Sequence, residues 1–177
     1  MNYKTVLLLF LSVFSFWSSL SLANNMKVYG SLVNEPCTIN PSDKELFIDF
    51  GEIRLLDIYE RNFEFKKKEV KLVLSDCDLS LASKVKVKFL GTQNNNIPGF
   101  LGFNDASANP DLGIGFEYYD GTPVELNTLS NLIPLKQEGR NELKFYTFLK
   151  ASDNGIANRT IRHGRFTATA TFLFEYE

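Results

Sequence analysis

The chain contains 177 residues, of which 44% are hydrophobic and 14% aromatic, and it carries a formal net charge of −2 at pH 7. This length is sufficient for one domain with a substantial core, and the nearly balanced charge offers no basic excess for binding nucleic acid. Phenylalanine supplies most of the aromatic residues, and an aromatic-rich composition is typical of β-sheet proteins.

A targeting segment opens the chain. Lys4 provides a positive charge, an apolar run covers residues 6–17, and Ser21 and Ala23 are small residues at the expected positions of a cleavage site. The run is shorter than the roughly 20 residues that a membrane-spanning helix needs. We therefore predict that residues 1–23 are a signal peptide that is removed on export, with a retained membrane anchor as the alternative.

Residues 24–36, which follow, alternate in character. One face would carry the apolar or small residues Met26, Val28, Gly30 and Leu32. A period of two indicates an extended strand, and a glycine inside a strand often marks a place where another backbone approaches closely. The residues by themselves fit an ordinary first strand equally well.

The chain contains two cysteines, Cys37 and Cys77. An even number of cysteines behind a secretion signal predicts one disulfide formed in an oxidising compartment. A metal-binding or catalytic thiol pair is the alternative, and the single histidine and the lack of a CxxC motif argue against it. Closing a loop of about 41 residues would stabilise the fold by roughly 4 kcal/mol in the chain-entropy model.

The middle of the chain predicts short strands separated by turns. Strands are expected at 46–51, 70–77, 85–91, 100–103, 112–119, 123–126 and 142–151. Asp120-Gly121 is a hairpin turn signal. Residues 54–65 fit either a loop or a helical turn, whereas 92–110 and 152–163 are predicted to be polar connections. The lysine run at 66–68 is interpreted as a solvated loop rather than as a contact for an acidic surface.

The last fourteen residues alternate more strictly than any other stretch. The apolar or small residues at every second position are Gly164, Phe166, Ala168, Ala170, Phe172, Phe174 and Tyr176. This period of two predicts a β-strand over 164–177 with one buried face. Because the chain ends here, no later segment is left to pair with the far edge of the strand. Exposed apolar edges promote aggregation, so we predict a partner from another chain; an ordinary terminal core strand is the alternative.

The two ends of the chain resemble one known family. Gly164 is the fourteenth residue from the end and Tyr176 is the penultimate one, and this spacing is similar to that of the chaperone–usher pilins, the subunits of type 1 and P fimbriae. The stretch from Gly30 to Cys37 resembles the pilin N-terminus, and residues 113–121 resemble the central pilin hairpin.

The resemblance implies an all-β fold, namely an incomplete immunoglobulin-like antiparallel sandwich that lacks its last strand. Residues 37–177 would be the pilin domain, and residues 24–36 a donor arm that inserts Met26, Val28, Gly30 and Leu32 into a neighbouring subunit. A periplasmic fimbrial chaperone would first fill the groove beside 164–177, and donor-strand exchange at the outer-membrane usher would replace it with the arm of a neighbouring pilin subunit. The product would be a fimbrium on the surface of a Gram-negative bacterium.

The function implied is therefore structural, with a contribution to bacterial adhesion. The short arm before Gly30 suggests a minor or adaptor subunit, and a terminating subunit is an alternative. A single-domain sugar-binding tip adhesin is the rival function, although family adhesins carry an additional lectin domain. No GxSxG, HExxH, P-loop or GxGxxG motif is present, so we expect no enzyme activity, no metal or other cofactor and no small-molecule substrate.

Overall fold

The computed structural model describes residues 26–32, 34–61, 65–105 and 109–177. The predicted signal peptide lies outside the described residues. The chain divides into two compact units, residues 1–33 and 34–177. In the first unit, residues 26–32 have no regular secondary structure and their side chains are exposed. Among the described residues, no helix has the length and apolar character needed to cross a membrane.

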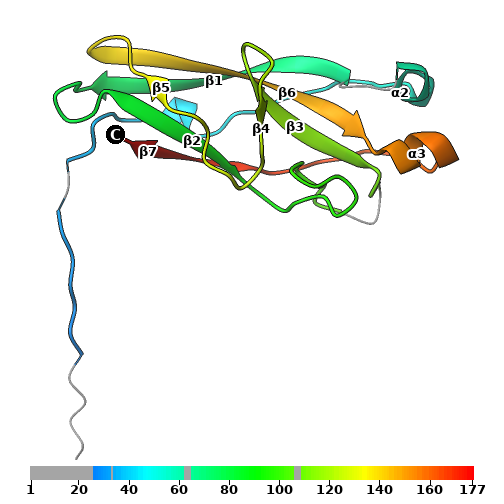
Figure 1. The fold of residues 1–177 in the computed structure, drawn as a ribbon, viewed down its shortest axis with the longest axis horizontal. Coiled ribbons are helices and arrows are strands. Elements are labelled where there is room, and N and C mark those ends of the chain that lie inside the picture. The colour runs from blue at the N-terminus through cyan, green and yellow to red at the C-terminus, as the bar shows by residue number, and fades with distance from the viewer. Residues whose placement is uncertain (1–25, 33, 62–64, 106–108) are drawn as a thin grey trace, which may run out of the picture. The chain divides into compact units, whose positions relative to one another are not determined.

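The second unit is a sandwich of two antiparallel sheets, which confirms the predicted all-β fold. One sheet has the strand order β1 (Phe65–Cys77), β6 (Gly139–Ala151), β3 (Leu112–Tyr118) and β4 (Pro123–Val124). The other has the order β5 (Ile133–Pro134), β2 (Lys84–Leu90) and β7 (Thr171–Tyr176). The short helices are η1 (Pro41–Asp43), α2 (Leu55–Arg61) and α3 (Asp153–Asn158). Figure 1 shows β2 and β7 in one layer and β1, β6 and β3 in the other.

The core lies between the two layers because each strand turns every second side chain inward. In β2 the alternation is regular, with Val85, Val87 and Phe89 buried and the intervening lysines more exposed. Phe89 stacks on Phe116 of β3 at a ring-centroid distance of 4.3 Å and meets Phe145 of β6 edge-on at 5.3 Å. Strand β6 pairs with both β1 and β3, so it is an interior strand of its sheet.

Strand β3 is buried on both faces because the preceding loop folds back over its outer side. A Cβ atom added to Gly115 would lie 2.6 Å from ring atoms of both Phe100 and Phe148. Those two rings pack edge-to-face with centroids 6.0 Å apart. Gly115 therefore leaves room for two aromatic rings, and a Cβ added to Gly113 would lie 3.1 Å from the Phe100 Cβ, so no nucleotide site is needed to explain the two glycines.

The predicted disulfide between Cys37 and Cys77 is present, with 4.1 Å between the two Cα atoms. Beside it, Thr38 and Ser75 exchange two backbone hydrogen bonds, of 2.7 and 2.8 Å. The covalent bond and this bridge together fasten the beginning of the second unit to the end of β1. Because the disulfide closes a separation of 40 residues, it greatly reduces the freedom of the unfolded chain.

Four predictions for the middle of the chain need correction. The lysine run at 66–68 belongs to β1 rather than to a loop. It occupies an edge strand, where lysines are common because they discourage pairing with other chains. The expected strand at 100–103 contributes only isolated bridges at Leu101, and the strand at 123–126 is limited to β4. The expected strand at 46–51 forms no ladder with any described segment.

The helical alternative for 54–65 is correct, since α2 lies there, but the polar connection after β6 also contains a helix. Helix α3 begins after Ser152, whose hydroxyl accepts a hydrogen bond from the Gly155 amide at 2.9 Å and so caps the helix. The Ser-Asp pair at 152–153 is the sequence signal for this start. The glycine in the first turn weakens that signal, because glycine is unfavourable inside a helix.

A buried carboxylate joins α3 to the loop before β3. Asp111 is only 5% exposed, and its oxygens accept hydrogen bonds from Thr160 Oγ1 at 2.5 Å, Ser152 Oγ at 2.7 Å and Asn96 Nδ2 at 2.9 Å. The hydrogen bonds from Thr160 and Ser152 are the main reason that the pKa of Asp111 is lowered from its usual value.

We expect Asp111→Asn to reduce the free energy of unfolding at pH 7 by about 1–3 kcal/mol, because an amide replaces a charged acceptor in a buried network. The depressed pKa means that the native carboxylate stabilises the fold above its unfolded-state pKa of about 3.9, and that this stabilisation is lost as the pH falls toward the folded value. Urea unfolding of both proteins from pH 7 to pH 3 should show the difference shrinking below pH 4. A constant difference over that range would contradict the assignment.

Candidate functional site

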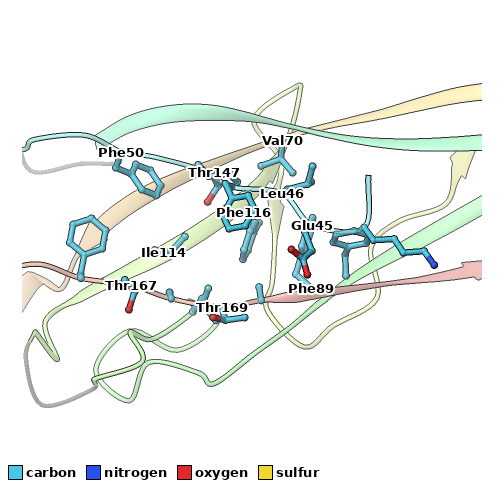
Figure 2. A pocket seen from close by; sticks show the side chains of 18 residues that line it. Glu45, Leu46, Phe50, Val70, Phe89, Ile114, Phe116, Thr147, Thr167 and Thr169 are labelled. Atoms are coloured by element: carbon cyan, nitrogen blue, oxygen red, sulfur yellow. The ribbon is translucent and has the colours of Figure 1, made fainter. Parts of the chain in front are cut away.

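An apolar groove of about 620 Å³ opens between two extended segments of the second unit. Residues 44–50 form one wall, and the terminal segment from Phe166 to Phe172 forms the other. The groove floor consists of core side chains from four strands: Val70, Phe89, Ile114, Phe116 and Thr147. Figure 2 shows Leu46 and Phe50 on one side and Thr167 and Thr169 on the other, with Ile114 and Phe116 between them. The groove therefore reaches directly into the hydrophobic core.

The terminal wall continues into β7, which is the outermost strand of its sheet in the described part of the chain. One edge of β7 pairs with β2, from Val85 opposite Tyr176 to Leu90 opposite Thr171. No described strand pairs with the other edge. A strand edge left in this way presents a row of backbone donors and acceptors to any extended chain that approaches it.

The ladder of the terminal segment is shorter than the sequence predicted. A strand was expected over 164–177, but β7 begins only at Thr171. The reason is that β2 ends at Leu90, which is the residue opposite Thr171, so no strand remains for the earlier residues to pair with. Residues 165–170 still alternate between exposed and partly buried side chains, although they lack a ladder.

The predicted inward face of the terminal segment does point to the core. Its partly buried members, all packed against the core, are Phe166, Ala168, Ala170, Phe172, Phe174 and Tyr176. Large rings occupy the two ends of this series and alanines the middle, so the groove lies where Ala168 and Ala170 leave space. Phe166 stacks on Phe103 with centroids 4.7 Å apart. Burial is the main cause that raises the pKa of Tyr176 to about 12.

Gly164 and His163 lie beyond the main groove, where they help to line a second cavity of about 210 Å³. Phe166 borders both cavities. Gly164 has a φ of 153°, and nothing lies within 4 Å of the position that its Cβ would take. This backbone conformation, rather than close packing, accounts for a glycine at the point where the terminal segment begins.

Sequence reasoning missed the role of the opposite wall. Residues 46–51 were expected to form a short strand, but the structure places this stretch along the groove without a ladder. Leu46 and Ile48 are 39% and 37% exposed, and Phe47 is 93% exposed. The short apolar alternation of residues 46–51 indicated an extended segment. The sequence of this stretch did not show that no strand would pair with it.

The remaining predicted site residues form two separate groups. The disulfide cysteines do not line the groove, and their role is to anchor the start of the domain. The predicted arm residues belong to the first unit, where Met26, Val28 and Leu32 are 87%, 80% and 105% exposed and nothing lies within 4 Å of the position of a Gly30 Cβ. No group of three or more metal-ligating side chains occurs among the described residues.

The groove suits one kind of occupant, an extended chain with apolar side chains at every second position. Neither wall forms a ladder along residues 45–49 or 165–170, and the floor between them is apolar. A strand placed there would cover the core and give the β7 edge the backbone partners that strands require. Peptide binding by addition of a strand to a free edge works in this way.

Comparison with known proteins identifies the family. A family model described as fimbrial protein matches residues 26–177. The chain belongs to this family. Relatives include the uncharacterized fimbrial-like protein YfcP of Escherichia coli (strain K12), 27% identical over 86% of this chain and 83% of the relative. Another is the putative minor fimbrial subunit PmfF of Proteus mirabilis (strain HI4320), 25% identical over 96% and 93% of the two chains.

Solved structures agree with this assignment. The P pilus rod subunit PapA superposes with a TM-score of 0.68 at 25% identity, covering 81% of this chain and all of PapA. A subunit of a chaperone–usher pilus superposes with a TM-score of 0.66 at 22% identity, over 89% and 97% of the two chains, and supports the fold. The chain is thus a structural subunit of a chaperone–usher fimbria with the immunoglobulin-like pilin fold, as the sequence resemblance implied.

Proposed function

We propose that the groove is an acceptor site for an extended arm of a neighbouring subunit, and that residues 24–36 of this chain are the arm offered to the next subunit. The observation that carries the proposal is the free edge of β7 beside a groove that opens into the core. Residues 37–177 are then a pilin domain that is complete only when a strand from another molecule occupies the groove. Repeating this contact head to tail would build a filament, because a heterologous contact that does not close continues indefinitely.

The arm has the pattern that the groove requires. Its apolar residues Met26, Val28 and Leu32 share one face of an extended chain, and each would contribute about 1.5–3 kcal/mol when transferred from water into the groove. Gly30 lies on the same face and would allow the two backbones to approach closely. The opposite face would remain in water.

The same proposal covers export and assembly. Residues 1–23 would be removed as a signal peptide, and the buried disulfide is consistent with passage through an oxidising periplasm. A periplasmic chaperone would cover the groove until the outer-membrane usher brings the next subunit. The protein would act without catalysis, and its chemistry would be limited to the exchange of one strand for another.

The arm can be tested with a synthetic peptide covering Asn24–Pro36 and a fluorescent label. The peptide should bind the refolded chain when no other strand occupies the groove. A Gly30→Leu peptide should bind at least tenfold more weakly, because a leucine side chain would meet the groove floor. A Ser31→Leu peptide is the matched control, since position 31 would face water. Equal binding of the two variant peptides would show that the alternation of the arm has no role.

The chaperone can be tested by expression in the periplasm. The chain alone should aggregate or be degraded, because the open groove exposes the core. Co-expression with the chaperone of its fimbrial system should give a soluble one-to-one complex, and changing Phe172 and Phe174 to Asp should abolish that complex. Gel filtration and yield measure both outcomes. Equal periplasmic yields of the soluble chain with and without the chaperone would contradict the proposal.

A further inference from the structure

The part of the terminal segment that precedes β7 is held by side-chain and loop contacts instead of a strand. Asn109 binds the backbone of Arg162 twice: its Nδ2 donates to the Arg162 carbonyl at 2.9 Å, and its Oδ1 accepts from the Arg162 amide at 2.7 Å. Further along, the Asn104 amide donates to the Thr167 carbonyl at 2.8 Å. These contacts take the place of the ladder that ends when β2 ends.

The Asn109 residue is itself held in place by the surrounding structure. Asn109 is only 5% exposed, and its carbonyl accepts a hydrogen bond from the Leu112 amide at the start of β3, at 3.2 Å. Two residues later, the Asp111 carboxylate is bound by Ser152 and Thr160. The residue that binds Arg162, Asn109, is therefore connected through these hydrogen bonds both to the four-stranded sheet and to α3.

This placement matters for the groove because an extended segment with neither edge paired would be free to change its backbone conformation. Binding an occupant would then have to fix that segment, which costs conformational entropy. A wall already held before binding avoids most of this cost. The hydrogen bonds from Asn109 and Asn104 are made to backbone atoms of the chain at Arg162 and Thr167. They leave the floor and the opposite wall of the groove uncovered.

We propose that Asn109 is a positioning residue for the acceptor groove: it fixes the backbone at Arg162, two residues before the terminal segment begins, and so helps to hold that segment in the extended conformation that the occupant needs. The Asn104 backbone supports the same segment at Thr167. The proposal rests on the function proposed above for the groove. Asn109 does not line the groove. Under this proposal it nevertheless contributes to the affinity for the occupant.

Asn141 provides a matched control within the same chain. It is a buried amide, 6% exposed, whose Oδ1 accepts from the Lys136 amide and whose Nδ2 donates to the Gln137 carbonyl, both at 2.7 Å. It therefore fixes a backbone segment by the same two kinds of hydrogen bond, although to two neighbouring residues instead of one, and Asn141 lies at the start of β6, away from the groove lining. Asn109→Ala and Asn141→Ala remove equivalent bonds at the two places.

The test uses the full mature chain, refolded with its disulfide intact, and the labelled Asn24–Pro36 peptide. Both variants should lower the urea midpoint to a similar extent. Asn109→Ala should weaken peptide binding at least tenfold and speed amide hydrogen exchange across residues 164–170 in the free chain, whereas Asn141→Ala should leave both unchanged. Should Asn109→Ala fail to fold, Asn109→Ser, which retains one hydrogen-bonding group, should show an intermediate loss of binding.

Equal binding losses for the two variants, or unchanged hydrogen exchange across residues 164–170 in Asn109→Ala or Asn109→Ser, would overturn the positioning role. Failure of the unmodified chain to bind the peptide would instead overturn the function proposed for the groove. In that case the hydrogen-exchange comparison, which needs no peptide, still decides whether Asn109 holds the segment.

Discussion

The structure depends on a terminal strand that, among the described residues, has a hydrogen-bonded neighbour on one edge only. The β2–β7 ladder satisfies one row of backbone groups, while no described strand meets the other edge. Backbone polar groups need partners, and apolar side chains beside them need cover. Both needs arise along the same edge, and one added strand can meet them together. This coupling makes an extended chain a better occupant than a small molecule.

The rest of the sandwich has a packed core of its own beside the gap. The four-stranded sheet carries a tightly packed face in which Phe145, Leu72 and Leu74 are fully buried, so the core does not rely on the groove residues alone. The disulfide ties the start of the domain to β1, and Asn109 binds the backbone at Arg162, four residues before the other wall begins at Phe166. The core is thus open to solvent at the groove between residues 44–50 and the terminal segment.

The sequence predicted the features that depend on local periodicity. Regular alternation gave β2, β6 and the inward face of the terminal segment, and Asp120-Gly121 gave the hairpin turn, where Gly121 has a φ of 86° and donates to the Tyr118 carbonyl. It failed where structure depends on which neighbour is present. Residues 46–51 have the pattern of a strand, but a strand needs a partner, and pairing is decided by the whole chain. The anchor at Asn109 was also out of reach, because it joins residues 53 positions apart.

The most direct test of the account is the structure of the mature chain bound to the peptide covering Asn24–Pro36. The account predicts that the peptide lies in the groove as an additional strand, hydrogen-bonded along the free edge of β7, with Met26, Val28 and Leu32 pointing to Ile114 and Phe116. The terminal segment should keep its backbone conformation at Arg162 and Thr167. A peptide bound elsewhere, or a groove closed by rearrangement of residues 44–50 with the β7 edge still unpaired, would contradict the account.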